Sequence, residues 1–169
     1  QQALYSVDCQ VEFFPLNGKK GFVLEEDFLQ ALTKEIDIIF LCNPNNPTGL
    51  LVEKTLLEKI LKRCQELNIL MAVDECFLDF VPSPEKYTLK EYLETYDNLF
   101  LLKAFTKRYA MAGVRLGYGL CGNKGLLEKI EGVCQPWNVF SMAEAAGLAA
   151  LQEREYVEEG RQVTFQELA

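Results

Sequence analysis

The chain contains 169 residues, with 17 basic and 25 acidic side chains, so its formal net charge is −8, and it has no histidine. A chain of this length can bury a sizeable core as one domain, and its hydrophobic content of 49% is typical of a globular protein. The negative charge disfavours binding to nucleic acid or anionic membranes, and the lack of histidine excludes triads and metal sites that use imidazole.

Strand and helix patterns alternate along the chain, which predicts an α/β fold with a mainly parallel sheet flanked by helices. The apolar run at 36–42 is continuous, as in a strand buried on both faces, and the apolar positions of 53–67 form one helical stripe. In chain order the expected elements are a strand at 11–15, a helix at 25–32, a strand at 36–42, a helix at 53–67, strands at 69–73, 99–104 and 116–121, and helices at 124–133 and 141–154.

The six cysteines are never closer than 12 residues, so the chain has no CxxC pair and no zinc pattern, and we expect no metal site. Most of them lie in apolar runs, which favours buried, reduced thiols in a cytoplasmic protein. No apolar run reaches about 18 residues and no basic-then-apolar start is present, so neither a membrane span nor a signal peptide is expected. The absence of an initial Met and the helical pattern at the end predict a fragment of a longer protein.

Polar residues follow two of the predicted strands directly. Asp74 comes after the strand at 69–73, and the loop at 43–49, with two prolines and Gly49, leaves Asn46 projecting after the strand at 36–42. Parallel α/β sheets bind ligands at the carboxyl ends of their strands, which favours a binding site here. Taken singly, each of these features is also compatible with an ordinary turn or a helix cap.

Lys107 follows a third predicted strand, at 99–104, and is flanked by apolar and aromatic residues. Apolar surroundings desolvate an amine and make its neutral, nucleophilic form more accessible. We therefore expect Lys107 to be partly desolvated and available as a nucleophile. The alternative is that Lys107 is an ordinary solvated surface lysine.

Three ordered segments together resemble the fold-type I family of pyridoxal 5'-phosphate (PLP) enzymes, in its aminotransferase class I/II branch. They are the loop at 43–49, the segment Val-Asp-Glu-Cys-Phe-Leu-Asp-Phe at 73–80, and Phe-Thr-Lys-Arg-Tyr-Ala-Met-Ala-Gly-Val-Arg-Leu-Gly-Tyr at 105–118. The resemblance spans essentially the whole chain and corresponds to the centre of the family's large domain. It implies a partial PLP-binding domain at 1–155 and, at 156–169, the start of a connection to a small domain.

The resemblance also implies a role for each site residue. Lys107 would form a Schiff base with PLP, and Asp74 would pair with the pyridine nitrogen and keep it protonated, so that the ring acts as an electron sink. Asn46 would hydrogen-bond the phenolic oxygen of the ring. Arg115 and the Thr106 hydroxyl would hold the phosphate, for which the forked arginine side chain is suited.

Two positions depart from the family pattern. Ala104 stands where a hydroxyl residue is usual, which removes a phosphate contact. Phe77, at a cofactor-binding position, stands where many aminotransferases have a tyrosine, which removes a donor to the ring oxygen. The order Asp-Glu-x-Phe-x-Asp-Phe, with Gln-Pro-Trp-Asn-Val at 135–139, is more similar to the threonine-phosphate decarboxylases of cobalamin biosynthesis than to the histidinol-phosphate aminotransferases.

The expected parent is therefore a PLP enzyme that acts on a small amino acid or amino phosphate and forms a homodimer, as the resemblance implies. Decarboxylation is the leading reaction, and histidinol-phosphate-type transamination is the alternative. A nucleotide- or flavin-binding module would require a glycine-rich phosphate loop after the first strand, and the Asn-Gly-Lys-Lys-Gly segment at 17–21 is too short for one. The chain by itself is expected to be inactive, because the rest of the large domain and the small domain are absent from it.

Overall fold

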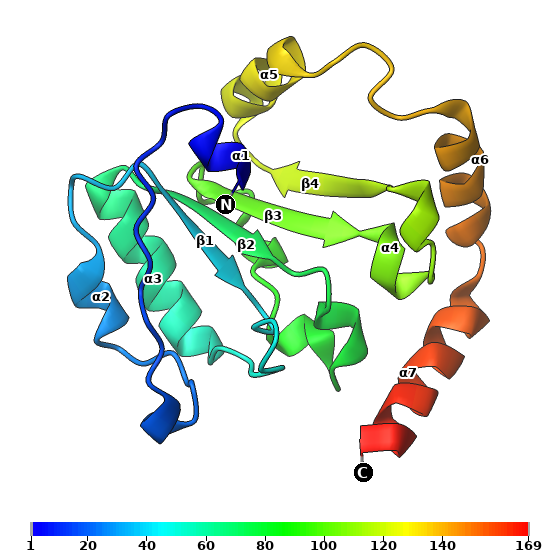
Figure 1. Cartoon of the computed structure of the whole chain (residues 1–169), viewed down its shortest axis with the longest axis horizontal. Coiled ribbons are helices and arrows are strands. Elements are labelled where there is room, and N and C mark those ends of the chain that lie inside the picture. The colour runs from blue at the N-terminus through cyan, green and yellow to red at the C-terminus, as the bar shows by residue number, and fades with distance from the viewer. Residues whose placement is uncertain (1, 169) are drawn as a thin grey trace.

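A four-stranded sheet organises the chain. The computed structural model describes residues 2–168, without the side chain of Leu168. Its strands are β1 (Ile38–Cys42), β2 (Leu70–Asp74), β3 (Leu99–Ala104) and β4 (Gly117–Cys121), and they lie in the order β1-β2-β3-β4. The first three strands are parallel and β4 is antiparallel to β3, as Figure 1 shows. The predicted mainly parallel α/β sheet is thus confirmed.

Seven helices accompany the sheet within residues 2–168, together with short 3₁₀ turns. The predicted helix at 25–32 is only one turn long, and the one at 141–154 ends at Ala150, after which a separate helix begins. The bounds are α1 (Gln2–Tyr5), α2 (Phe28–Ala31), α3 (Lys54–Leu67), α4 (Phe105–Arg108), α5 (Lys124–Val133), α6 (Ser141–Ala150) and α7 (Arg154–Leu168). None of these helices is long and apolar enough to cross a membrane.

The predicted strand at 11–15 is wrong, because the segment has no strand partner. Pro15 lacks the amide hydrogen that a sheet ladder needs. Instead of joining the sheet, Phe14 packs edge-on against Phe28 of α2, with ring centroids 5.0 Å apart. One of the apolar side chains that suggested a strand, Phe14, thus packs against a helix, whereas Phe13 is 66% exposed.

Helix α3 covers one face of the sheet because its apolar residues fall on a single stripe. Its end is set by Asn68, whose left-handed backbone (φ 59°) lets its amide hydrogen reach the carbonyl groups of Cys64 and Gln65. The stripe packs against the face that we call the core face. The buried residues of this layer are Leu56, Leu57, Ile60, Leu61 and Cys64 of α3, with Ile39 of β1, Met71 and Val73 of β2, and Leu99 and Leu101 of β3.

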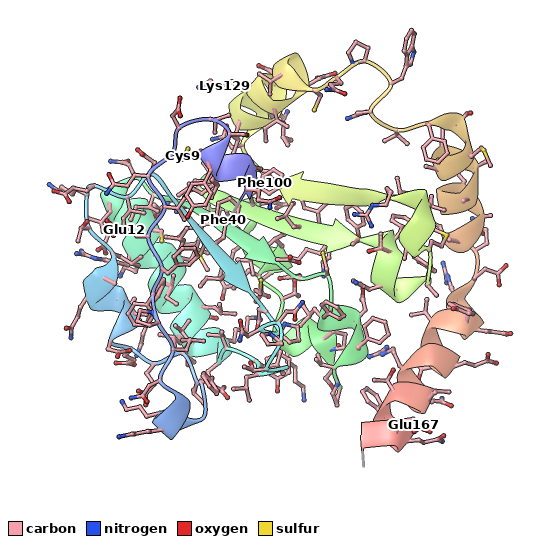
Figure 2. The ribbon with its side chains drawn as sticks, in the orientation of Figure 1. Cys9, Glu12, Phe40, Phe100, Lys129 and Glu167 are labelled. Carbon is pink, nitrogen blue, oxygen red and sulfur yellow. The ribbon has the colours of Figure 1, made fainter. Side chains whose placement is uncertain are left out.

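The opposite face, which we call the open face, has no comparable helix in this part of the protein. Its residues on the three parallel strands are Ile38, Phe40 and Cys42 of β1, Leu70, Ala72 and Asp74 of β2, and Phe100, Leu102 and Ala104 of β3. Phe40 is 53% exposed and Phe100 is half-buried, and both are labelled in Figure 2. The expectation that 36–42 is buried on both faces is therefore wrong for this chain. A continuous apolar run does not specify how many layers cover the strand.

Small residues allow α6 to approach the segment that leads into β4. Ala143, Gly147 and Ala150 are buried on one side of the helix. A Cβ atom added at Gly147 would lie 2.5 Å from Cδ2 of Leu116, so a larger residue here would require the Leu116 side chain to shift. Beyond α6, Arg161 of α7 donates to the Val81 carbonyl at 3.5 Å. Figure 1 shows α6 and α7 beyond the end of the sheet at which α4 lies.

Candidate functional site

The predicted site residues follow the ends of neighbouring strands at one edge of the sheet. Because β1, β2 and β3 are parallel, the chain leaves all three at the same edge, and antiparallel β4 starts there. Asn46 lies in the loop after β1, Asp74 ends β2, and Lys107 lies in α4 directly after β3. Arg115 precedes β4 at this same edge. One amide, one carboxylate and two cationic side chains are thus brought to the edge where parallel sheets bind ligands.

Asp74 is half-buried on the open face between two thiols. Its Oδ1 accepts the amide hydrogen of Cys76 at 2.9 Å, and its backbone carbonyl accepts that of Asn43 at 2.9 Å. Burial and, after it, the Asp74 carboxylate raise the pKa of Cys76 to about 12, and the same two causes raise the pKa of Cys42, its register partner. Asp74 has no ion-pair partner among residues 2–168, so its carboxylate is available to a cationic group.

Lys107 is exposed, so the predicted desolvation of its amine is wrong for this chain. The reason is helical geometry. Phe105 and Tyr109 lie one turn apart on the same side of α4 and stack at 5.2 Å, whereas Lys107 points to the other side. Its Nζ lies 5.2 Å from the centroid of the Phe77 ring and has no ion-pair partner among the described residues. The result is an accessible amine with one aromatic neighbour.

Phe77 links the segment after β2 to α4. Its ring is 37% exposed, contacts Lys107 on one side and is tilted against Phe80, with centroids 6.4 Å apart. The structure therefore brings together two of the residues that the sequence assigned to cofactor binding. Phe77 carries no group that could donate a hydrogen bond to a ligand at this position.

The loop after β1 is closed on itself and leaves the Asn46 side chain exposed. Asn45 donates to the Thr48 hydroxyl at 2.8 Å, and the amide hydrogen of Gly49 bonds to the Asn45 carbonyl at 2.7 Å. Gly49 has φ 73°, a left-handed conformation that favours glycine. The Asn46 amide hydrogen lies close enough to the Cys42 sulfur to favour the thiolate slightly, which places Asn46 near the end of β1.

Thr106 and Arg115 lie on adjoining segments. The amide hydrogen of Phe105 bonds to the Leu116 carbonyl at 3.1 Å, which ties the start of α4 to the chain next to Arg115. Arg115 is exposed, with φ 57°, and its Nη1 donates to the Ala112 carbonyl at 3.2 Å. Most of its donors remain available, as an anion-binding arginine requires.

Two fully buried polar residues, Asn43 and Glu75, lie beside the site and were not predicted as part of it. Asn43 accepts the amide hydrogen of Val52 at 2.9 Å and donates to the Tyr87 carbonyl at 3.3 Å. Its place directly after β1 was visible in the sequence, but its burial was not. Glu75 continues the alternation of β2, a signal that would have placed it on the face opposite Asp74.

The site is an open edge and not an enclosed pocket. A depression of about 460 Å³ lies at the opposite edge of the sheet, where Asn68, Asn98 and Asn123 contribute to its wall. A smaller one, of about 150 Å³, lies between β3, β4 and α7 and includes Lys103 and Arg108. No predicted site residue lines either of them. Among residues 2–168, no cluster of acidic or cysteine side chains is placed to hold a metal ion.

The cysteines are unpaired but less buried than expected. Cys64 is the buried one, whereas Cys9, Cys42 and Cys134 are exposed. The apolar neighbours of Cys42 lie along β1, but the side chain itself points to the open face, and residues 2–168 do not cover it. The prediction that most of the thiols are buried is therefore wrong.

The donor set fits PLP. The cofactor needs an amine for attachment, a carboxylate for its pyridine nitrogen, a polar contact for its ring oxygen and a clamp for its phosphate. Lys107, Asp74, Asn46 and Arg115 offer these four functions at one edge, with Thr106 beside Lys107. The amine, the carboxylate and the guanidinium all lack an ion-pair partner in the described part of the chain.

Comparison with known proteins gives a consistent result. Residues 2–168 match the family model described as aminotransferase class I and II. A threonine-phosphate decarboxylase from Salmonella typhimurium is 38% identical over 90% of this chain, and a histidinol-phosphate aminotransferase from Caldicellulosiruptor saccharolyticus is 32% identical over 85%. The chain spans 41% and 39% of the lengths of these two relatives.

Solved structures include the same two kinds of enzyme. A histidinol-phosphate aminotransferase from Clostridium acetobutylicum superposes with a TM-score of 0.86 at 30% identity, covering 94% of this chain and 47% of that one. An L-threonine-O-3-phosphate decarboxylase from Porphyromonas gingivalis gives 0.77 at 25% identity, covering 92% of this chain and 44% of that one. The histidinol-phosphate aminotransferase from Sinorhizobium meliloti, solved with pyridoxal-5'-phosphate, gives 0.67 at 25% identity, with coverage of 74% and 33%.

Proposed function

Because the chain belongs to the aminotransferase class I and II family, whose members are PLP-dependent, we propose that it is the cofactor-holding part of a PLP enzyme. The observation that carries this proposal is the placement of Asn46, Asp74 and Lys107 after three adjacent parallel strands. The unpaired amine of Lys107 and the unpaired carboxylate of Asp74 are the two groups whose chemistry the cofactor requires most directly.

Each residue of this chain has a defined task in the proposal. PLP, when bound, supplies an electron-withdrawing ring that stabilises negative charge on a substrate carbon. Lys107 provides the attachment amine and holds or releases a proton at Nζ. Asp74 holds a proton on the pyridine nitrogen through its charge, and Asn46 orients the ring by donating to its phenolic oxygen. Phe77 packs beside the Lys107 amine.

The phosphate of the cofactor is assigned to Thr106 and Arg115. A guanidinium group offers two parallel donors to a phosphate, and a hydroxyl adds a third. Ala104 contributes no hydroxyl, so the clamp relies more heavily on Arg115 than in relatives with a serine or threonine at this position. The exposed Arg115 side chain, with a single backbone partner, is free to make this contact.

For the substrate, we propose a phosphorylated amino acid or amino alcohol, with decarboxylation of threonine phosphate as the leading reaction. The 38% identity to a threonine-phosphate decarboxylase and the phenylalanine at position 77 favour it over transamination. Transamination of the histidinol-phosphate type is the second candidate, because relatives of that kind match at 32% identity and in fold. Both reactions use the same residues of this chain.

Three further parts of the proposal concern the whole protein. The partial PLP-binding domain would occupy residues 1–155, and 156–169 would begin a connection to a small domain. The whole protein would be a homodimer in the cytoplasm, as the family resemblance and the unpaired cysteines suggest. Size-exclusion chromatography with light scattering tests the dimer, and cell fractionation tests the location.

The attachment residue is tested by chemical trapping in the whole protein. After loading with PLP, borohydride reduction should leave a pyridoxyl group on the peptide that contains Lys107. The matched control is Lys129→Ala, which removes an exposed lysine of α5 and should leave the labelling intact, whereas Lys107→Ala should abolish it. Stoichiometric labelling at another of the twelve lysines would refute the assignment.

The reaction is tested by product analysis. Threonine phosphate should release CO₂ without a keto-acid acceptor, and histidinol phosphate with 2-oxoglutarate should yield little glutamate. Efficient glutamate formation without release of CO₂ would replace the decarboxylase proposal with the aminotransferase one.

A further inference from the structure

A buried ion pair lies directly behind the proposed site. The Glu75 side chain is completely buried, and its Oε2 lies 2.7 Å from Nζ of Lys103, whose side chain is only 15% exposed. The Thr88 hydroxyl lies 3.0 and 2.9 Å from the two Glu75 oxygens and donates to the carboxylate, and the amide hydrogen of Leu89 adds a third contact at 3.2 Å. A buried charge with this many partners holds its neighbours in fixed positions, because each lost contact would leave a desolvated charge.

The pair joins the two strands that carry the proposed cofactor contacts. Glu75 directly follows Asp74, and Lys103 lies on β3 four residues before Lys107. Because side chains alternate along a strand, Asp74 points to the open face while Glu75 points to the core face. The amide hydrogen of Glu75 also bonds to the Leu102 carbonyl of β3 at 3.0 Å. The ends of β2 and β3 are thus connected by both backbone and side chains.

The segment at 87–89 holds the end of β1 through a hydrogen bond. Asn43, directly after β1, donates to the Tyr87 carbonyl at 3.3 Å, and its own amide hydrogen bonds to the Asp74 carbonyl at 2.9 Å. Thr88 and Leu89, next in the chain, bind Glu75. One short segment therefore contacts the chain immediately beyond β1 and β2, and Glu75 relays that contact to β3 through Lys103.

We propose that Glu75 is a positioning residue, which together with Lys103 and Thr88 fixes the placement of Asp74 relative to Lys107 and so sets the geometry of the cofactor site. This inference rests on the proposed function, because it concerns how this chain holds PLP. Glu75 and Lys103 act through the strand ends that they join and through their charges, without touching the cofactor.

Because the two residues carry opposite charges, the proposal predicts the direction in which each variant shifts the protonation midpoint of the bound cofactor. A purely structural role predicts no such direction. Glu75→Gln keeps the shape of the side chain but leaves the Lys103 ammonium unpaired behind Asp74. Lys103→Met leaves the Glu75 carboxylate unpaired. An extra positive charge disfavours protonation of a nearby group, and an extra negative charge favours it. The two variants should therefore shift the protonation midpoint of the bound cofactor in opposite directions.

The experiment uses the whole protein loaded with PLP and records its visible absorbance against pH, together with the dissociation constant for PLP. We expect Glu75→Gln to lower the midpoint and Lys103→Met to raise it, each by about half a pH unit, or about threefold in proton affinity. Both should weaken PLP binding by about tenfold, and the double variant should bring the midpoint back towards that of the unsubstituted protein.

Two further variants separate positioning from a general loss of stability. Leu32→Ala removes a buried core side chain that makes none of the contacts of the ion pair, and should lower the melting temperature without moving the midpoint or the PLP affinity. Thr88→Val keeps both charges and the side-chain volume but removes the hydroxyl donor. It tests the proposal even where a charge variant does not fold, and should weaken PLP binding by about threefold.

The outcomes distinguish the two proposals. If the unsubstituted whole protein takes up no PLP that borohydride can trap, the proposed function is refuted, and this inference is refuted with it. If the unsubstituted protein binds PLP, but Thr88→Val and every charge variant that folds behave like Leu32→Ala, Glu75 has no positioning role and the pair serves the fold alone. Equal shifts in the same direction for both charge variants would also overturn the proposal.

Discussion

The two faces of the sheet differ in burial, although the same strands form both: the core face is covered by α3 and the open face is partly exposed. On β1, Ile39 is 8% exposed and its neighbour Phe40 is 53% exposed. On β2, Met71 and Val73 enter the core beneath α3, while Asp74 turns to the open face. Strand geometry thus separates residues that stabilise the fold from residues that can meet a ligand by a single step along the chain.

The separation is not complete at the edge where the site lies. There the core face changes from apolar to charged, because Glu75 follows Val73 and Lys103 follows Leu101 at the alternating positions. The open face changes from apolar to polar at the same edge, where Phe40 of β1 is followed by Cys42, which lies beside Asp74 of β2. Polar side chains therefore lie on both faces at the strand ends: Glu75 is ion-paired with Lys103 on the core face, whereas Asp74 on the open face has no ion-pair partner among residues 2–168. In the proposed function, this difference separates the pair that supports the site from the carboxylate that meets the cofactor.

The largest effect is expected from truncation on the core face. Leu101→Ala should lower the free energy of unfolding by about 2–5 kcal/mol, because Leu101 is fully buried and its removal leaves a cavity. Phe40→Ala on the open face should cost less than half as much, since more than half of Phe40 is already exposed. Urea denaturation measures both. An equal cost would show that another part of the whole protein covers the open face.

A substitution of Asp74, at the carboxyl ends of the parallel strands, is expected to reduce activity without reducing stability. Asp74→Asn should reduce kcat/KM by about 100-fold, because the uncharged amide no longer holds a proton on the pyridine nitrogen. The melting temperature without cofactor should change little, as the side chain is half-buried and has no ion-pair partner among the described residues. Kinetics combined with thermal melting checks this, and a collapse of the melting temperature would assign Asp74 to the fold instead.

Thiol reactivity offers a finer probe of the two environments. Burial raises the pKa of Cys64 to about 12, whereas at Cys76 burial and, after it, the Asp74 carboxylate together raise the pKa to about 12. Asp74→Asn should therefore lower the pKa of Cys76 and speed its alkylation by about tenfold at pH 8, where the thiolate is the reacting form, and leave Cys64 unchanged. Mass spectrometry of the labelled peptides measures both rates. Equal acceleration at the two sites would indicate general loosening of the fold.

The smallest expected effect is a gain of one hydrogen bond at position 77. Phe77→Tyr adds a phenol next to Lys107, where it can donate to the ring oxygen of the cofactor and stabilise its anionic form. The midpoint of the absorbance titration should fall by about one pH unit, since one such bond is worth about 1–3 kcal/mol. Leu50→Tyr is a control that adds a phenol at a surface position outside the site. No shift with Phe77→Tyr would mean that the ring oxygen is not near position 77.

Much of the fold follows from local patterns. The helix at 53–67 and the three parallel strands were predictable because α3 has one apolar stripe and each strand is a short apolar run. The prediction of a strand at 11–15 failed because the segment has no strand partner and Phe14 packs against α2 instead, an interaction that no local pattern reveals. The predicted desolvation of Lys107 failed for a related reason, since its apolar neighbours in sequence lie on the opposite side of a single helical turn and leave the amine exposed.

The sequence by itself determined which residues follow which strands, and from the order of three motifs it determined the family and the candidate residues Asn46, Asp74 and Lys107. Order along the chain is sufficient for this because parallel strands deliver their carboxyl ends to one edge. Only the tertiary structure decided that Asp74 has no ion-pair partner among residues 2–168, while Glu75 is buried against Lys103 and Thr88. Both are carboxylates at consecutive positions, and what distinguishes them is the set of segments packed against each face, which the folded chain alone specifies.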